Sequence, residues 1–216
     1  MERIYVIDNG SLFAGNLRVL TGMHGSTTVI PCTEIAAAEI DPYAPLVLSG
    51  GPINIYGNES RYAAEIELIQ NHRGPIIGIC LGFEMIAVAY GEKLVKLPSY
   101  VGFPITHNGV HAPSPDYYTD VFDIPIATYD DVLEYAPGTT IKAFKSHGWA
   151  VQEVGDEFKV LARSGTGIEI MRHASKPIWG FQFHPEIVQD NTAADIVFHK
   201  IMKSFVKEDA HIAIAA

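Results

Sequence analysis

Short apolar runs alternate with segments of helical spacing over the first 90 residues of the chain. Four of the runs have the composition and length of a buried strand: residues 4–7, 27–30, 46–48 and 75–77. Between and after them, the apolar spacing predicts three helices, over about residues 11–23, 61–71 and 81–90. Strands that alternate with helices favour a parallel sheet covered on both faces, which binds ligands beyond the carboxyl ends of its strands.

The second half of the chain follows another pattern. Residues 94–135 hold five prolines and many aromatic residues but little helical period, so we expect loops and short antiparallel strands beside the site. Strand character returns over residues 140–144 and 158–172, and residues 192–206 have the spacing of a closing amphipathic helix. With 216 residues, the chain is most simply one domain, residues 1–216, with ample length for a core.

The first candidate for chemistry is Cys80, which lies between Gly78 and Gly82 directly after an apolar run. This pattern predicts a strand that turns sharply into a helix, a geometry that holds a side chain exposed above a sheet. Glycines are expected on both sides because a Cβ there would collide with the neighbouring strand and helix. The amide of Leu81 would point at the site and could stabilise an oxyanion. Such a segment can also be only a tight junction around a buried thiol.

His184 and Glu186 supply the groups that a cysteine nucleophile needs. Their spacing of two residues puts both side chains on one face of an extended segment, which suits a base and the carboxylate that orients it. His147 is a rival base, but no carboxylate stands two residues after it. Together with the turn at Cys80, the pair favours a cysteine nucleophile over a structural junction.

Four segments resemble the class I (triad) glutamine amidotransferases and occur in that family's order: residues 6–10, 48–52, 75–82 and 177–186. The resemblance implies a three-layer α/β/α fold, flavodoxin-like, with a mainly parallel central sheet and a small antiparallel extension. It also implies that the γ-glutamyl group of glutamine forms a thioester with Cys80 and that ammonia leaves. His184 would be the base and acid of this reaction, with Glu186 as its partner. The amides of Gly51 and Leu81 would form the oxyanion hole.

The resemblance also implies which residues bind the substrate. Gly50 belongs to the Ser-Gly-Gly-Pro turn. This turn lacks the Gly-Lys-Ser/Thr ending of a phosphate-binding loop, so the sequence does not favour a phosphate site here. Ser146 and Gly148 match a segment that lines the family's glutamine pocket with backbone groups and a small side chain. Trp149 either lines this pocket or packs in an apolar region with its indole N–H as the one polar group.

Glu84 departs from the family's pattern, because most members carry glutamine four residues after the cysteine. On a helix this spacing puts Glu84 on the same face as Cys80. An ionised carboxylate only accepts hydrogen bonds, whereas an amide also donates, so Glu84 would hold the α-ammonium of glutamine and repel its α-carboxylate. The substitution is either tolerated or changes the substrate. The related γ-glutamyl hydrolases have a similar Cys-Leu-Gly-Phe-Glu segment, so a partner-independent γ-glutamyl hydrolase or peptidase is an alternative.

Composition argues against several other classes of protein. The 25 acidic and 15 basic residues give a net charge of −10, which argues against a nucleic-acid partner. The two cysteines make no disulfide framework, and the histidine pairs His107/His111 and His24/His72 lack a third ligand at short spacing. We therefore expect no metal and no other cofactor. No signal peptide is visible and no apolar run approaches membrane-spanning length, so a cytoplasmic protein without a membrane partner is expected.

The ammonia acceptor is expected to be bound elsewhere, because the sequence contains no visible ATP-binding motif. The resemblance therefore implies that the partner is a separate ATP-dependent synthetase subunit. Three segments look most like the separate amidotransferase subunits of GMP synthases, which act in purine biosynthesis: residues 146–148, 168–171 and 184–187. A non-catalytic, amidotransferase-like regulatory protein is a further alternative, against which the intact Cys80, His184 and Glu186 count.

Overall fold

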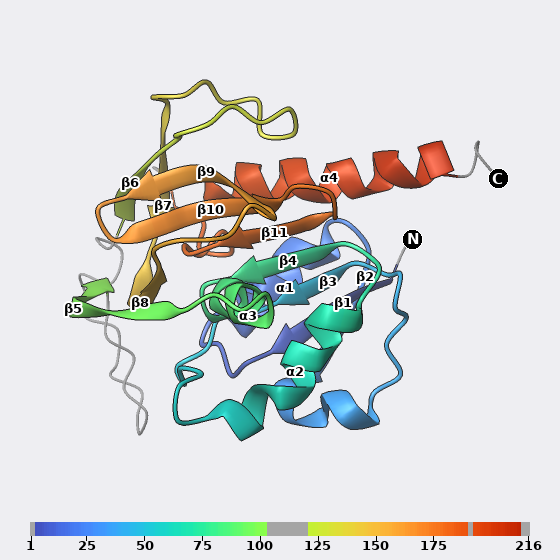
Figure 1. The fold of residues 1–216 in the computed structure, drawn as a ribbon. Helices are drawn as coiled ribbons and strands as arrows, with labels where there is room; N and C mark the ends of the chain where they lie inside the picture. Colours follow the sequence, from blue (N-terminus) through green and yellow to red (C-terminus); the bar gives the residue numbers. More distant parts are fainter. Residues whose placement is uncertain (1–2, 103–120, 190–191, 213–216) are drawn as a thin grey trace.

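The computed structural model describes residues 3–102, 121–189 and 192–212. A seven-stranded sheet forms its centre (Figure 1). The first five strands in spatial order are parallel, the sixth runs in the opposite direction, and the seventh is antiparallel to the sixth. In spatial order the strands are β2 (Ser26–Pro31), β1 (Arg3–Asp8), β3 (Leu46–Leu48), β4 (Ile76–Ile79), β11 (Ile178–Phe181), β10 (Gly167–His173) and β9 (Phe158–Ser164).

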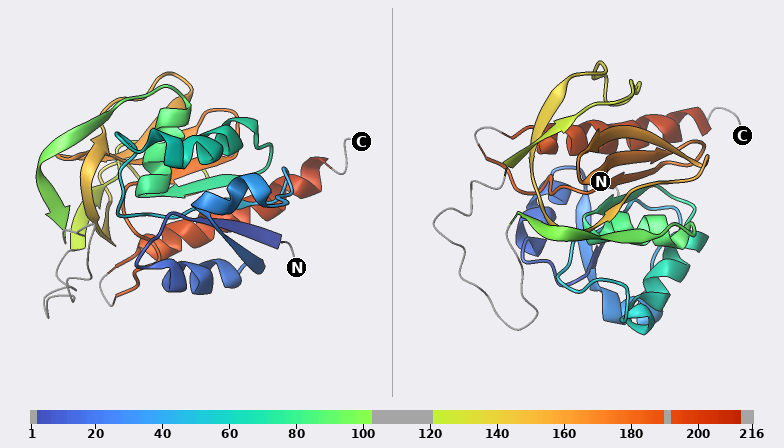
Figure 2. Two further views of the ribbon diagram at one scale, coloured as in Figure 1. Left: turned by 90° about the horizontal axis from the view of Figure 1, so that it is seen from below. Right: turned by 60° about the vertical axis from the view of Figure 1, so that its left-hand side comes forward.

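Helices cover both faces of this sheet, as the left view of Figure 2 shows. One face carries α1 (Ala14–Gly22) and α4 (Ala194–Ile212), and the other carries α2 (Glu59–Asn71), α3 (Leu81–Ala89) and the 3-10 helix η1 (Cys32–Ala37). The alternation of strand side chains explains why there are two cores. In β1, Ile4 and Val6 pack with α1 and α4, whereas Tyr5 and Ile7 pack with α2 and α3.

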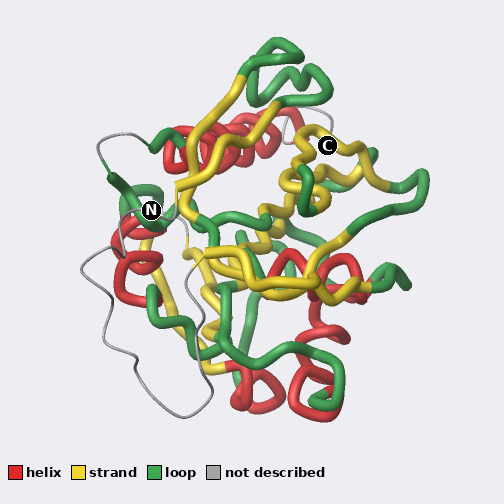
Figure 3. The backbone as a smooth tube through the Cα atoms, turned by 90° about the vertical axis from the view of Figure 1, so that its left-hand side faces the viewer, coloured by secondary structure: helices red, strands yellow, loops and turns green. Residues whose placement is uncertain are grey.

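Two small antiparallel pairs extend the fold beside the carboxyl ends of the parallel strands (Figure 3). They join β5 (Leu94–Gly102) to β8 (Ser146–Val151), and β6 (Val121–Pro125) to β7 (Thr140–Phe144). The three-layer fold with a mainly parallel sheet and an antiparallel extension is thereby confirmed. Part of the segment 94–135, including His107 and His111, lies outside the described residues.

Two helix boundaries differ from the predicted ones for local reasons. The first helix begins at Ala14 rather than near residue 11, because the carboxylate of Asp8 accepts the amides of Gly10 and Ser11 at 2.9 and 3.1 Å and holds them in a turn. The last helix continues to Ile212 rather than ending near residue 206, since no glycine or proline follows to stop it. Among the helices of the described residues, none has the length and apolar character needed to span a membrane.

Candidate active site

The turn between β4 and α3 holds Cys80 in an unusual backbone conformation. Its φ of 52° and ψ of −106° are values that residues with a side chain rarely adopt. Close packing on both sides fixes this turn. A Cβ at Gly78 would lie 2.5 Å from the carbonyl oxygen of Gly82, and a Cβ at Gly82 would lie 2.4 Å from that of Leu48. The two glycines therefore let α3 press against β3 and β4, which leaves Cys80 at the end of the sheet.

His184 and Glu186 follow β11, the strand beside β4, so the fold brings them to the same edge of the sheet as Cys80. The Nδ1 atom of His184 lies 2.8 Å from Oε1 of Glu186, and both side chains are buried. Cys80 and His184 meet over Gly50, where an added Cβ would lie 2.9 Å from Cε1 of His184 and 3.4 Å from Cβ of Cys80. Since Nδ1 faces Glu186, Nε2 is the ring nitrogen left for proton exchange with a sulfur.

The electrostatics of this group follow from burial and from the opposite charges. Burial on its own lowers the pKa of His184, but Glu186 and Cys80 outweigh it and raise that pKa above its ordinary value. Burial raises the pKa of the Cys80 thiol, and His184 opposes that rise. The contribution of Cys80 to the pKa of His184 exists only while the sulfur is a thiolate. Cys80 and His184 therefore each change the pKa of the other.

A cavity of about 200 Å³ opens beside Cys80. Six other residues that the sequence predicted for the site line it: Gly51, Leu81, Glu84, Ser146, Gly148 and Trp149. Gly50 lies beneath Cys80 and His184 instead. The cavity also has walls that the sequence analysis did not name for binding, from Pro52, Asn54, Lys96 and His147. The thiol of Cys80 donates weakly to the carbonyl oxygen of Ser146 at 3.6 Å.

His147, the rival base, is oriented by the backbone instead of by an acid. Its Nδ1 lies 2.7 Å from the carbonyl oxygen of Trp149. Burial lowers the pKa of His147 to about 4, so its ring is neutral at pH 7. It lacks the carboxylate that would stabilise a positive imidazolium, which makes it a weaker candidate than His184 for a base.

Glu84 differs from the ionised side chain that the sequence analysis considered. It is only 4% exposed, and its Oε1 accepts a hydrogen bond of 3.1 Å from Nε2 of Gln182. Burial raises the pKa of Glu84 to about 8, because no water shell stabilises its charge. Most of Glu84 is therefore un-ionised at pH 7. A neutral carboxyl group donates one hydrogen bond and accepts others, which makes it closer to the glutamine that it replaces than to a carboxylate.

A polar network that was not predicted from the sequence lies under the Ser-Gly-Gly-Pro turn. The Asn9 amide nitrogen Nδ2 donates to the carbonyl oxygen of Ser49 and to Oε1 of Glu65, both at 3.1 Å. The Asn9 backbone amide donates to Oγ of Ser49 at 2.9 Å, and that hydroxyl donates to the carbonyl of Gly50 at 2.8 Å. Glu65 is fully buried, and burial raises its pKa to about 7. One feature of the sequence could have revealed Glu65: it is an acidic residue three positions after Tyr62 and four before Ile69, which places it on the buried face of α2.

A second missed feature lies next to Ser146. Lys145 and Glu169 form an ion pair whose two side chains are almost completely buried. Lys145 also donates to Oγ1 of Thr166 at 2.8 Å. The pair ties the junction between β7 and β8 to β10, and so fixes the strand that supplies one wall of the cavity. In the described residues, no group of three or more histidine, cysteine, aspartate or glutamate side chains is placed to hold a metal ion.

Comparison with known proteins shows the family of this chain. The sequence model of the family described as "Glutamine amidotransferase class-I" matches residues 5–204. The glutamine-hydrolysing GMP synthase subunit of Thermococcus kodakarensis is 34% identical over 198 residues, which are 89% of this chain and 94% of that protein. The protein with the same description from Methanosarcina mazei is 33% identical over 205 residues, 91% of this chain and 94% of that protein.

Solved structures share the fold. The crystal structure of a putative GMP synthase subunit from Thermoplasma acidophilum superimposes with a TM-score of 0.78, 22% identity, and coverage of 99% of this chain and 98% of that one. A glutamine amidotransferase from Thermotoga maritima gives a TM-score of 0.65 at 15% identity and covers 99% of this chain and 86% of that one. The resemblance found in the sequence is confirmed: this chain belongs to the class I glutamine amidotransferase family.

Proposed function

We propose that this protein is the glutamine-hydrolysing subunit of a two-subunit GMP synthase, with Cys80 as nucleophile, and that it acts in the cytoplasm. It would convert glutamine and water into glutamate and ammonia, and a separate ATP-dependent synthetase subunit would use the ammonia. The relatives described as glutamine-hydrolysing GMP synthase subunits support the assignment to this enzyme. The observation that carries the chemistry is the meeting of Cys80 with the His184–Glu186 pair over Gly50, next to a cavity.

The proposed reaction begins when Cys80 transfers its proton to His184 and its sulfur attacks the γ-carboxamide carbon of glutamine. The amides of Gly51 and Leu81 would stabilise the oxyanion of the tetrahedral intermediate. His184 then gives its proton to the departing nitrogen, so ammonia leaves and a γ-glutamyl thioester remains on Cys80. Water, deprotonated by His184, attacks the thioester, and glutamate and the thiol are released. Glu186 stabilises the imidazolium that forms in each half of the reaction.

The cavity also suits the amino-acid end of glutamine. Lys96 lies on its wall and supplies a positive charge for the α-carboxylate. A neutral Glu84 does not repel that carboxylate and still accepts a hydrogen bond from the α-ammonium. Ser146, Gly148 and Trp149 contribute backbone groups and an aromatic wall. Most of the repulsion that an ionised Glu84 would cause is therefore removed at pH 7.

The test is an assay of glutamate and ammonia release from glutamine, combined with labelling by a diazo-ketone glutamine analogue. We expect the label on Cys80 and not on Cys32, which is buried in the other core. Cys80→Ser should lose both label and turnover, whereas the matched variant Cys32→Ser should keep both. Unchanged labelling of Cys80→Ser would refute the nucleophile assignment.

A γ-glutamyl hydrolase is the second candidate, because the segment Cys-Leu-Gly-Phe-Glu around Glu84 is similar to that of those enzymes. The same assay separates the two functions when a γ-glutamyl peptide is offered beside glutamine. Rapid turnover of the peptide without any synthetase, with glutamine ignored, would favour the hydrolase. Slow hydrolysis of glutamine that becomes faster with a synthetase subunit would favour the amidotransferase.

A further inference from the structure

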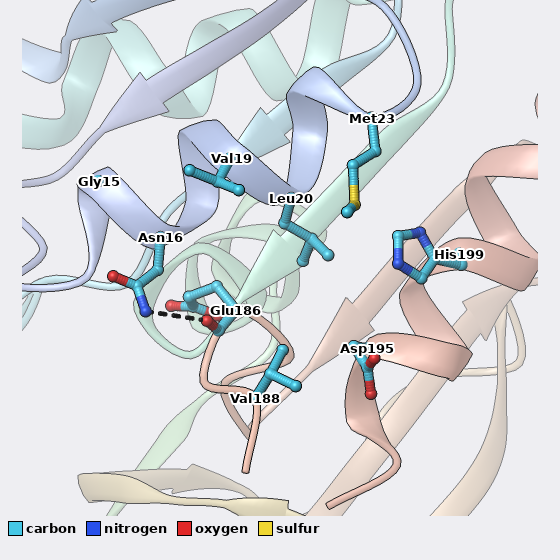
Figure 4. Close-up of a pocket in the computed structure, with 9 residues that line it drawn as sticks. All are labelled: Gly15, Asn16, Val19, Leu20, Met23, Glu186, Val188, Asp195 and His199. Atoms are coloured by element: carbon cyan, nitrogen blue, oxygen red, sulfur yellow. Dashed lines mark hydrogen bonds between the residues drawn. The ribbon is translucent and has the colours of Figure 1, made fainter.

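A second hollow, of about 500 Å³, lies between α1, the segment after β11 and the start of α4 (Figure 4). Three large apolar side chains on its wall are strongly exposed: Val19 by 67%, Met23 by 69% and Val188 by 60%. They make an apolar rim that nothing in the described residues covers, and the buried Leu20 lines the hollow inside it. Exposed apolar side chains gathered around one hollow are typical of an interaction surface. We call this surface the α1–α4 face.

The α1–α4 face adjoins the candidate active site directly. Glu186 forms part of the wall of the hollow, and Nδ2 of Asn16 donates to the backbone carbonyl of Glu186 at 3.3 Å (Figure 4). Val188, on the rim, is only two residues further along the chain. A molecule seated here would therefore touch the segment that carries the partner of His184.

The same side of the molecule also reaches Cys80. A narrow space of about 10 Å³ is lined by Ser11, Leu12 and Phe13, just before α1, and by Cys80 and His184. Leu12 is 55% exposed, so this space lies close to the surface near the start of α1. The space shares Gly51, Pro52, Cys80 and Ser146 with the cavity that contains Glu84 and Trp149, so the two adjoin at Cys80.

Charge indicates what the hollow accepts. Its described lining includes the carboxylates of Glu186 and Asp195 but no lysine or arginine, and the whole chain carries a net charge of −10. An apolar rim beside acidic groups fits an aliphatic stem that ends in a positive charge. A lysine or arginine side chain of another protein has this shape, and the opposite charges would also steer its approach.

We propose that the synthetase subunit docks on the α1–α4 face and places a lysine or arginine side chain beside Asp195. By contacting Asn16 and Val188, the docked subunit would hold the segment around Glu186 and so alter the rate of glutamine hydrolysis. This inference rests on the proposed function, since it requires a synthetase partner. Docking would hold the segment that positions Glu186, and Glu186 in turn orients His184. The expected effect on turnover is therefore a rise in kcat with little change in KM, because the contact orders a catalytic group and leaves the glutamine cavity as it is.

The experiment measures how tightly the purified synthetase subunit binds and how fast glutamine is hydrolysed with and without it. Val19→Asp and Met23→Asp should weaken binding by roughly tenfold or more, since each buries a carboxylate in an apolar contact. Their hydrolysis rate without synthetase should equal that of the wild type, because both side chains are exposed and neither touches the reacting groups. Asp195→Lys should weaken binding through repulsion.

Two further variants make the test discriminating. Asn16→Ala should bind the synthetase within about twofold of the wild type but should lose most of the stimulation of kcat, because the link to Glu186 is cut. Val95→Asp is the matched control: Val95 is 46% exposed and lies on β5, next to Lys96 at the glutamine cavity. Normal binding and stimulation of Val95→Asp are expected.

Three outcomes would overturn the inference while the proposed function stands, and the first two concern binding of the synthetase. One is normal binding and stimulation of Val19→Asp and Met23→Asp. The other is loss of binding in Val95→Asp alone, which would place the synthetase over β5. Self-association of the wild type that Val19→Asp abolishes, with synthetase binding intact, would also contradict it, because a second copy would then occupy the face. No hydrolysis of glutamine under any condition would instead refute the proposed function.

Discussion

At the scale of single residues, burial decides the protonation state of the groups around Cys80. Glu84 and Glu65 are carboxyl groups with little or no exposure, and amide groups of Gln182 and Asn9 contact them rather than cations. Burial therefore raises both pKa values, to about 8 for Glu84 and about 7 for Glu65. For His184, burial is the largest single influence and lowers the pKa, but Glu186 and Cys80 together outweigh it and raise that pKa. The environments of Glu84 and Glu65 can each be tested with a variant.

Glu84 should give the enzyme an alkaline limit that glutamine at this position would not have. If the neutral form binds substrate, kcat/KM for glutamine should fall by roughly tenfold between pH 7 and pH 9 as Glu84 ionises. Glu84→Gln should keep the activity at pH 7 and shift or remove this decline. The measurement is the pH profile of kcat/KM for both proteins. A decline of the same size and midpoint in Glu84→Gln would assign it to another group, such as the Cys80–His184 pair.

Glu65 should position the turn that carries Gly51 without touching the substrate. Glu65→Leu removes the acceptor of the Asn9 amide, which should cost about 1–3 kcal/mol of stability. We expect kcat to fall by roughly tenfold with a smaller change in KM, because a displaced oxyanion amide matters mainly in the transition state. Glu65→Gln keeps an oxygen that can accept the same hydrogen bond and should restore kcat. Equal kcat values for the wild type and Glu65→Leu would limit Glu65 to a structural role.

At the scale of elements, the backbone at the junction between β4 and α3 is strained, and this strained conformation positions the Cys80 side chain. Strand pairing on both sides holds β4, between β3 and β11, and the close approach of Gly82 to β3 holds α3. Cys80 joins these two fixed elements and therefore takes a φ of 52° that a residue with a Cβ ordinarily avoids. The rest of the fold stabilises this conformation and leaves the sulfur beside His184.

Relieving this strain should stabilise the protein and abolish its activity. Cys80→Gly permits the observed φ and ψ, whereas Cys80→Ala keeps the Cβ and loses only the sulfur. We expect Cys80→Gly to be more stable than Cys80→Ala by about 1 kcal/mol, which corresponds to a rise of roughly 2–4 °C in Tm for a chain of this size. Thermal unfolding of the two inactive proteins measures the difference. A lower Tm for the glycine variant would mean that the turn carries little strain.

At the scale of the whole molecule, the buried carboxyl groups link stability to pH. Glu84 and Glu65 have folded-state pKa values of about 8 and about 7, against 4.5 as the ordinary value. Between 4.5 and these values the folded protein binds more protons than the unfolded chain, so these groups make stability fall as pH rises. His147 acts in the opposite sense below pH 6.5, because its pKa is lowered by burial to about 4. Stability should therefore decline from about pH 6.5 to pH 8.

The double variant Glu65→Gln/Glu84→Gln tests this account of stability. Its free energy of unfolding should depend less on pH between 6.5 and 8 than that of the wild type, since neither amide titrates. Denaturant unfolding at a series of pH values measures the slope for both proteins. Identical slopes in the two proteins would show that these carboxyl groups do not control stability in this range.

The layered fold and the elements that carry the site follow from local patterns in the sequence. Alternating apolar runs and helical spacing are local patterns, and the glycines around Cys80 are a local steric signature, so both can be read along the chain. The segment with His184 and Glu186 was recognisable because its spacing is also a local pattern. These patterns gave the parallel strands and the turn before α3 correctly, and they erred mainly at helix ends such as that of α4, where no breaker residue stops the helix.

Features that depend on contacts between distant segments could be seen only in the folded structure. Glu65 lies 56 residues from Asn9, and Gln182 lies 98 residues from Glu84, so neither partnership leaves a local pattern. The protonation of Glu84 could not be inferred from residue type, because burial by surrounding segments sets it. The hollow beside Asn16 and Glu186 likewise exists only where α1, α4 and the segment after β11 meet. Local sequence specifies elements and turns, whereas folding decides which charges lose water and which side chains meet.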